Sequence, residues 1–229
     1  MKRILICEDE SAIREFVIIN LKRAGYETVA VASGEEAMLA FDEYRGDFSI
    51  ALLDVMLPGI DGFEVCKRLR EKSDTMGIIM LTAKAQEMDK ISGLMIGADD
   101  YMTKPFSPAE LTARVDAIYR RVTMSTGNRG VENCITSGNY VLNTNTRIVT
   151  KGDKTVELTH IESNILEFLL RNTGMAVTRE KILKNIWGND YVGDNKIVDV
   201  NIRRLRNKIE DDPSNPLHIN TVWGTGYKW

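Results

Sequence analysis

The residues from Ile50 to Gly59 read Ile-Ala-Leu-Leu-Asp-Val-Met-Leu-Pro-Gly, a short apolar run that ends at Asp54. A bounded apolar run of this length is typical of a buried strand. Alternation of such strands with helices predicts a doubly wound parallel sheet of the α/β class over residues 1–121. Four further strands are expected at Ile4–Cys7, Thr28–Val31, Ile78–Leu81 and Tyr101–Thr103, and helical spacing is seen in Ala12, Phe16 and Ile19, in Phe63, Cys66 and Leu69, and in Leu111, Val115 and Ile118.

The composition is that of a globular protein with room for two domains. The chain has 229 residues, of which 43% are hydrophobic and 28% charged. No apolar run approaches the roughly 20 residues needed to span a bilayer, so no membrane association is expected. The apolar start ends at Glu8, which is too short for an export signal, and we expect a cytoplasmic protein. Cys7, Cys66 and Cys134 are widely spaced and are interpreted as reduced thiols.

Charge is unevenly distributed along the chain. Residues 1–122 hold 16 basic and 21 acidic side chains, a net charge of −5, whereas residues 123–229 hold 14 and 12, a net charge of +2. Nucleic-acid binding therefore belongs to the second half, although this mild excess is weak evidence by itself.

Polar residues follow four of the predicted strands. The carboxyl ends of parallel strands meet at one edge of a sheet, so these side chains should converge there. Two carboxylates about 5 Å apart repel by roughly 3 kcal/mol at an effective dielectric constant near 20, and a cluster of three indicates a bound cation. Oxygen ligands without His or Cys favour Mg²⁺. The residues are Glu8 and Asp9 after the first strand, Asp54 after the third, Thr82 after the fourth and Lys104 after the fifth.

This combination suits phosphoryl transfer. An exposed carboxylate can attack phosphorus, while a metal ion, a lysine and a hydroxyl neutralise and hold the phosphoryl oxygens. A phosphatase of the haloacid-dehalogenase type also uses an aspartate with Mg²⁺, but it needs a second aspartate two residues after the first. Met56 occupies that position, which argues against this class.

Glu8-Asp9-Glu10, Leu53 to Gly59, Leu81-Thr82-Ala83, and Gly97 to Phe106 together resemble the receiver domain of two-component response regulators, a flavodoxin-like fold. The resemblance covers residues 2 to about 121 and implies that Asp54 is the phosphoacceptor. It implies that Glu8, Asp9, Asp54 and the carbonyl of Met56 hold Mg²⁺. Thr82 and Lys104 would bind the phosphoryl group, Tyr101 would be the aromatic switch residue, and the bond before Pro105 would be cis.

The resemblance also implies that two receivers pair after phosphorylation, through the face formed by the fourth helix, the fifth strand and the fifth helix of the domain. The resemblance implies cross-subunit ion pairs of Lys90 with Glu110, Asp100 with Arg114, and Asp99 with Arg121. Exposed pairs contribute only about 0–1 kcal/mol each, so they would set orientation more than affinity. Solvated charges without any dimer are the alternative interpretation.

The second half has a different pattern. Residues 122–131 are small and polar and are expected to form a flexible linker. Cys134 to Leu158 alternates like short antiparallel strands, and Thr159-His160-Ile161-Glu162 is a capping box that opens a helix. Two more helices, from Thr178 and around Val198 to Ile209, precede a hairpin at Ile219 to Tyr227. Residues 132–229 are thus predicted to form an α+β winged helix-turn-helix domain.

The third of these helices is the candidate DNA reader. Val198, Ile202, Leu205 and Ile209 fall within one arc and should face the core. The opposite face, with Lys196, Val200, Arg203 and Asn207 and with Arg204 beside them, should enter a major groove. A solvated basic helix end is the alternative. The residues expected to contact DNA are Lys196, Val200, Asn201, Arg203, Arg204 and Asn207.

Glu157-Leu158-Thr159, Ile186-Trp187-Gly188, Val198 to Arg206, and Thr221 to Tyr227 resemble the effector domain of the OmpR/PhoB type. The sequence departs from that family at three positions. Asn201 replaces a frequent phosphate-contacting His, Ile197 replaces a common Thr, and Trp223 replaces an Arg that enters the minor groove. Because Trp lacks the charge of Arg, wing contacts with the minor groove are in question.

The two resemblances imply a transcription regulator and not an enzyme. A sensor histidine kinase would phosphorylate Asp54 with Mg²⁺, the protein would form a homodimer, and the dimer would bind repeated sites in double-stranded promoter DNA and act on RNA polymerase. The alternative is a DNA-binding regulator that works without phosphate and uses its first domain only for dimerisation.

Overall fold

The computed structural model describes residues 2–83, 96–124, 133–188, 191 and 195–229. The chain divides into two compact units, residues 1–122 and 123–229. Each unit is described by itself.

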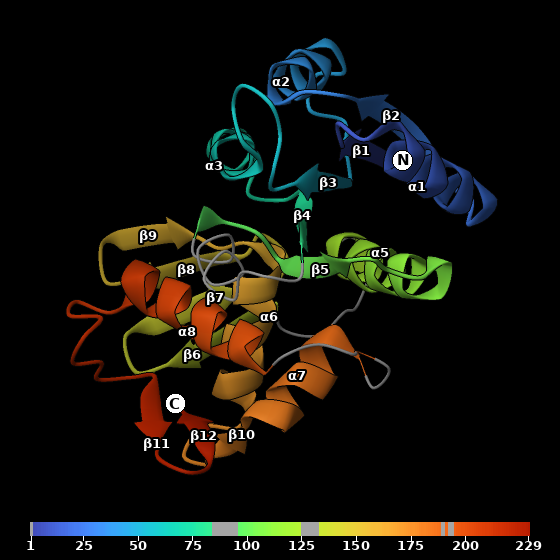
Figure 1. The fold of residues 1–229 in the computed structure, drawn as a ribbon. Coiled ribbons are helices and arrows are strands. Elements are labelled where there is room, and N and C mark those ends of the chain that lie inside the picture. The colour runs from blue at the N-terminus through green and yellow to red at the C-terminus, as the bar shows by residue number, and fades with distance from the viewer. Residues whose placement is uncertain (1, 84–95, 125–132, 189–190, 192–194) are drawn as a thin grey trace. The chain divides into compact units, whose positions relative to one another are not determined.

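The first unit is a five-stranded sheet with helices on both faces (Figure 1). The strand order is β2-β1-β3-β4-β5, and all neighbouring strands are parallel, which confirms the predicted sheet. Helices α1 and α5 cover one face, and α2 and α3 cover the other. In chain order the elements are β1 (Arg3–Cys7), α1 (Ser11–Arg23), β2 (Glu27–Val31), α2 (Gly34–Glu43), β3 (Ile50–Asp54), α3 (Gly62–Lys72), β4 (Gly77–Ala83), β5 (Asp100–Lys104) and α5 (Pro108–Met124).

A cluster of apolar side chains fills the core between the sheet and helices α1 and α5. Val17 and Leu21 of α1 pack with Leu111, Val115 and Ile118 of α5 against the sheet. Ile19 is 49% exposed, so the stripe of Ala12, Phe16 and Ile19 expected from the sequence is rotated from the observed one. The buried residues of α1, Val17 and Leu21, are four positions apart, so they lie on the same face of the helix, which contacts the core.

The α5 helix runs past the predicted domain end. Residues 122–124, which the sequence analysis assigned to the linker, are helical. Val122 lies seven and four residues after Val115 and Ile118 and packs on the same core, which continues the helix. The rest of the predicted linker, residues 125–131, lies outside the described residues.

The second unit is a winged helix preceded by an antiparallel sheet. The sheet β6-β7-β8-β9 consists of Cys134–Ser137, Tyr140–Asn143, Ile148–Lys151 and Lys154–Glu157. Then come α6 (His160–Arg171), β10 (Val177–Thr178), α7 (Arg179–Trp187), α8 (Lys196–Ile209), β11 (Asn220–Val222) and β12 (Gly226–Lys228). The short strand β10 pairs with β12, a contact that the sequence analysis did not predict.

The predicted capping box at the start of α6 is present. The Thr159 side chain accepts a hydrogen bond from the Glu162 N–H, and the Glu162 carboxylate accepts one from the Thr159 N–H. Glu162 is completely buried, so this cap lies inside the domain, beside α8.

Candidate functional site

The register of the sheet brings the strand-end residues of the first unit together. Cys7 pairs with Leu53, and Asp54 pairs with Leu81, so Glu8, Asp54 and Thr82 lie at one edge. Ala83 pairs with Lys104, which places the lysine at the same edge. The peptide bond between Lys104 and Pro105 is cis, as the resemblance implied.

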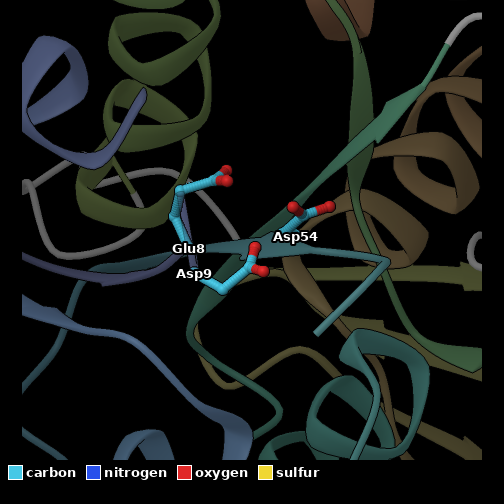
Figure 2. A group of neighbouring side chains, drawn as sticks. All are labelled: Glu8, Asp9 and Asp54. Carbon is cyan, nitrogen blue, oxygen red and sulfur yellow. The ribbon is translucent and has the colours of Figure 1, made fainter. Parts of the chain in front are cut away.

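Three carboxylates form a cluster at this edge. Ligand oxygens of Glu8, Asp9 and Asp54 all lie within 4.8 Å of one another. Figure 2 shows the three side chains directed toward a common space. Glu8 is fully buried and Asp54 is 4% exposed, whereas Asp9 is open to solvent. A cluster that is buried on one side and open on the other can admit a small ion and a phosphodonor.

Lys104 bridges two members of the cluster. Its ammonium group lies 2.7 Å from Glu8 Oε1 and 2.7 Å from Asp54 Oδ2. Burial by itself lowers the pKa of Lys104, but the bonds to Asp54 and Glu8 outweigh burial and raise it, so the group is charged at neutral pH. Burial raises the pKa of Glu8 to about 7, against the opposing effect of Lys104. Three carboxyl groups thus share a single ammonium group, and the site favours a further cation.

The donor set fits Mg²⁺. Glu8 Oε2 is buried and has no hydrogen-bond partner among the described residues, although its neighbour oxygen is bonded to Lys104. A buried carboxylate oxygen without a partner is costly, and a bound cation would remove that cost. Glu8, Asp9 and Asp54 provide only oxygen ligands, which a small hard cation prefers.

The second oxygen of Asp54 is held by the chain that follows it. Asp54 Oδ1 accepts a hydrogen bond from the Met56 N–H at 3.1 Å, while the Met56 side chain points to solvent and is 69% exposed. Thr82 is buried and its hydroxyl donates to the Ala83 carbonyl. Tyr101, on β5, is 8% exposed.

Two residues that support this site were not singled out from the sequence. Arg14 of α1 donates to the carbonyl oxygens of Glu8, at 2.6 Å, and of Asp9, at 3.1 Å, and so fixes the backbone of the acidic pair. A Cβ atom on Gly62 would overlap the carbonyl of Asp54, so only glycine permits this close approach. The position of Gly62 directly after the helix cap Asp61 was the available signal.

Of the residues expected to form cross-subunit ion pairs, those whose side chains the structure describes already have partners within the chain. Asp99 is bonded to Arg70 at 2.8 Å, and Asp100 is paired with Arg114 at 3.1 Å. Arg114 also contacts Glu110 at 3.0 Å, one helical turn away. Asp99, Asp100 and Arg114 are buried, so the expectation that all three pairs are exposed is wrong. Lys90 and the side chain of Arg121 lie outside the described residues.

Helix α8 presents a narrower polar face than its sequence indicated. Lys196, Arg203 and Asn207 are exposed, but Val200 and Arg204 are buried, which corrects the prediction that they face outward. Asn201, which was expected to contact DNA, is buried as well. Asn201 donates to the Ile197 carbonyl one turn earlier, and Arg204 forms an ion pair with the buried Glu162 at 3.1 Å. A buried carboxylate needs a cationic partner, and this need turns Arg204 inward.

The hairpin of β11 and β12 is tied to α8. Arg206 of α8 donates to the Ile219 carbonyl and the Thr221 hydroxyl, and the Tyr227 hydroxyl donates to Asp199 at 2.6 Å. At the turn of the hairpin, Trp223 is 89% exposed. Helix and wing are therefore joined by hydrogen bonds, and an aromatic side chain lies exposed at the turn of the wing.

Comparisons with known proteins agree with both units. The model of the response regulator receiver domain matches residues 4–116, and that of the transcriptional regulatory protein, C terminal, matches residues 153–229. The sensory transduction protein RegX3 of Mycolicibacterium smegmatis is 41% identical over 228 residues, covering 100% of this chain and 99% of RegX3. The solved structure of a RitR mutant is 27% identical with a TM-score of 0.77, covering 100% of this chain and 98% of that one.

A further solved structure indicates which family of response regulators the chain resembles. The response regulator DrrB of Thermotoga maritima, described as an OmpR/PhoB homolog, is 32% identical with a TM-score of 0.51 and covers 100% of this chain and 99% of DrrB. A receiver joined to a DNA-binding domain defines a two-component transcriptional response regulator. Within that class, the chain belongs to the OmpR/PhoB family.

Two further features bear on the sequence analysis. None of the helices in the described part of the chain is long and apolar enough to cross a membrane. Cys7, Cys66 and Cys134 are free thiols, and burial raises the pKa of Cys7 to about 12, which makes it unreactive.

Proposed function

We propose that a sensor histidine kinase phosphorylates Asp54 of this regulator in the cytoplasm, and that the phosphorylated protein pairs and binds repeated promoter sites, where RNA polymerase is its further partner. The observation that carries the proposal is the Lys104 ammonium group held between Asp54 and Glu8 in a three-carboxylate cluster. A lysine between buried acids at a strand end, next to a buried hydroxyl, is suited to hold a transferred phosphoryl group.

In the proposed reaction, an oxygen of Asp54 attacks the phosphorus of a phosphohistidine. The new P–O bond forms as the P–N bond breaks, and the histidine recovers its nitrogen lone pair. Lys104 and the Thr82 hydroxyl then bind phosphoryl oxygens. Glu8, Asp9, Asp54 and the Met56 carbonyl would hold Mg²⁺, which when bound neutralises charge on the phosphoryl group.

A short series of contacts connects Thr82 to the face through which we propose that two receivers pair. Thr82 pairs with Thr103 on β5, and Tyr101 lies two residues before it and next to Asp100. Movement of Thr82 toward a phosphoryl oxygen would therefore shift β5. Asp100 is joined to Arg114, and Arg114 to Glu110, so the shift reaches the α5 side of the face. Exchange of these contacts for cross-subunit ones is the proposed switch.

A regulator that works without phosphate is the second candidate. A receiver used only for dimerisation has no need of a complete acidic site, and here Glu8, Asp9, Asp54, Thr82 and Lys104 are all present at one edge. We therefore favour the phosphorylated mechanism.

Addition of beryllofluoride and Mg²⁺ is expected to convert the wild-type protein from monomer to dimer in sedimentation velocity and to raise its affinity for a repeated DNA site. Two linked DNA-binding domains gain about 10²–10⁴ in avidity without any new contact. Glu110→Lys is expected to prevent this dimerisation, because it places like charges opposite each other in the proposed pair with Lys90.

The matched control reverses both charges. Lys90→Glu combined with Glu110→Lys rebuilds the pair with opposite sign and should restore at least part of the dimer. Asp54→Ala should stay monomeric with beryllofluoride. Dimerisation of Glu110→Lys at the wild-type level would show that pairing uses another surface.

The proposed DNA contacts are those of the exposed face of α8. Arg203 and Lys196 supply charge, and Asn207 supplies an amide, on the side away from the buried Arg204. Arginine binds the edge of guanine with two hydrogen bonds, whereas lysine mostly contacts phosphate. Arg203 is therefore the proposed base-reading residue, in place of the pair of arginines suggested by the sequence.

Arg203→Ala is expected to weaken binding to a selected DNA site by about 1–3 kcal/mol and to relax preference at one base position, as measured by fluorescence anisotropy with single-base variants of the site. The control is Lys154→Ala, which removes an exposed cation of β9 that pairs with Asp211, beyond the last residue of α8. It should reduce affinity slightly and equally for all sequences. A uniform loss with Arg203→Ala would assign Arg203 to the DNA backbone instead.

A further inference from the structure

The loop after β3 bears the proposed Met56 ligand, and its two ends are fixed by backbone hydrogen bonds. The Val55 N–H donates to the Leu81 carbonyl at 2.9 Å, and the Gly62 N–H donates to the Val55 carbonyl at 3.1 Å. Asp61 then caps α3 by accepting from the Glu64 N–H. These bonds hold the loop where it begins and where it ends.

The last part of the same loop is also held from α2. Glu35 Oε1 accepts a hydrogen bond from the Ile60 N–H at 3.0 Å. Two glycines permit this approach. A Cβ atom on Gly34 would lie 2.5 Å from the Ile60 carbonyl oxygen, and one on Gly59 would collide with the Glu35 carboxylate. Gly59 also has a φ of +77°, which glycine adopts at little cost.

Glu35 is not needed to cap its own helix. The Ser33 side chain accepts from the Glu36 N–H, and the Glu36 carboxylate accepts from the Ala32 N–H, so Glu36 closes the start of α2. Hydrogen bonds from its own N–H and from the Ile60 N–H lower the pKa of Glu35, which keeps it ionised at neutral pH. A charged acceptor forms a stronger bond to a loop N–H than a neutral one.

We propose that Glu35 is a positioning residue for the Asp54 site, which holds the loop from Val55 to Asp61 so that the Met56 carbonyl is placed for the metal ion. The inference rests on the proposed function of that site. Glu35 contacts neither the metal ion nor the phosphoryl group and acts only through the Ile60 N–H. Groups that orient metal ligands from outside the ligand shell typically change metal affinity about 10- to 100-fold when they are removed.

The test uses ¹⁵N amide spectra of the full chain during a Mg²⁺ titration. Glu35→Ala is expected to raise the half-saturating Mg²⁺ concentration about tenfold and to speed hydrogen exchange of the Ile60 amide. Glu35→Gln keeps an acceptor oxygen without the charge, so it should retain protection of Ile60 and bind Mg²⁺ with an intermediate affinity. Gly34→Ala displaces the same loop from the other side and should weaken Mg²⁺ binding in the same way.

The charge control is Glu43→Gln, at the opposite end of α2, which removes one exposed carboxylate and should leave both Mg²⁺ binding and Ile60 exchange at the wild-type level. Wild-type Mg²⁺ affinity in both Glu35→Ala and Gly34→Ala would overturn the inference, as would equal effects of Glu43→Gln and Glu35→Ala. If the wild type binds no Mg²⁺ at Asp54, the proposed function of the site fails first. Normal binding by wild type and variants alike refutes only the role of Glu35.

Discussion

Incubation with acetyl phosphate and Mg²⁺ is expected to add one phosphoryl group to the wild-type protein and none to Asp54→Asn, as measured by intact-protein mass spectrometry. The asparagine keeps the shape of the side chain but has no nucleophilic carboxylate oxygen. Asp54 is the member of the cluster with one oxygen on Lys104 and the other on the Met56 N–H, so it is the most firmly oriented of the three acids. Loss of labelling should be complete.

Two further variants make the result specific. Asp74→Asn removes an acid before β4, at the amino ends of the strands, and should be labelled like the wild type. Lys104→Ala should be labelled more slowly, because the transferred group loses its proposed cationic partner. Labelling of Asp54→Asn at the wild-type level would contradict the assignment of Asp54 as the phosphoacceptor.

Glu162→Ala is expected to destabilise the DNA-binding domain by about 3–5 kcal/mol, a large part of the stability of an ordinary domain. Glu162 is fully buried, and its carboxylate contacts Arg204 at 3.1 Å and Lys208 at 2.9 Å. Its removal leaves the buried guanidinium group without its opposite charge and also deletes the cap on the Thr159 N–H.

Urea unfolding of the full chain, followed by tryptophan fluorescence, can isolate this effect. All three tryptophans, Trp187, Trp223 and Trp229, lie in the second unit, so the signal does not report on the receiver. With an m-value of about 2 kcal/mol per M, the unfolding midpoint should fall by about 2 M. Glu167→Ala is the control, since its pair with Arg171 on the same helix is exposed and should contribute about 0–1 kcal/mol.

The Glu162 contribution should also depend on pH. Burial by itself raises the pKa of Glu162, but Arg204 and Lys208 together outweigh burial and lower it. Stabilisation by a lowered carboxyl pKa is fully present above the unfolded value, about 4.3, and is lost as the pH falls through the folded value. The unfolding midpoints of wild type and Glu162→Gln should therefore converge below about pH 4. A difference that stays constant as the pH falls well below about 4 would contradict the ionised pair.

The sequence by itself determined the alternation of strands and helices in the first unit and the composition of the acidic site. Apolar runs such as Ile50 to Leu53 are local signals, and in a parallel sheet the strand ends necessarily meet. The positions of Glu8, Asp54, Thr82 and Lys104 along the chain therefore suffice to assign them to one edge, and the register of the strands confirms that placement. The capping box at Thr159 was also predictable, because it spans only four residues.

Only the tertiary structure decided which charged residues face inward. Arg204 was expected on the outer face of α8, and its partner Glu162 lies 42 positions earlier, on another helix. Asp99 likewise meets Arg70 from α3, and Asp100 meets Arg114 from α5. Helical periodicity predicts which residues share a face of a helix, but not which face packs against the neighbouring element. A buried charged side chain pairs with the opposite charge that the packing places beside it.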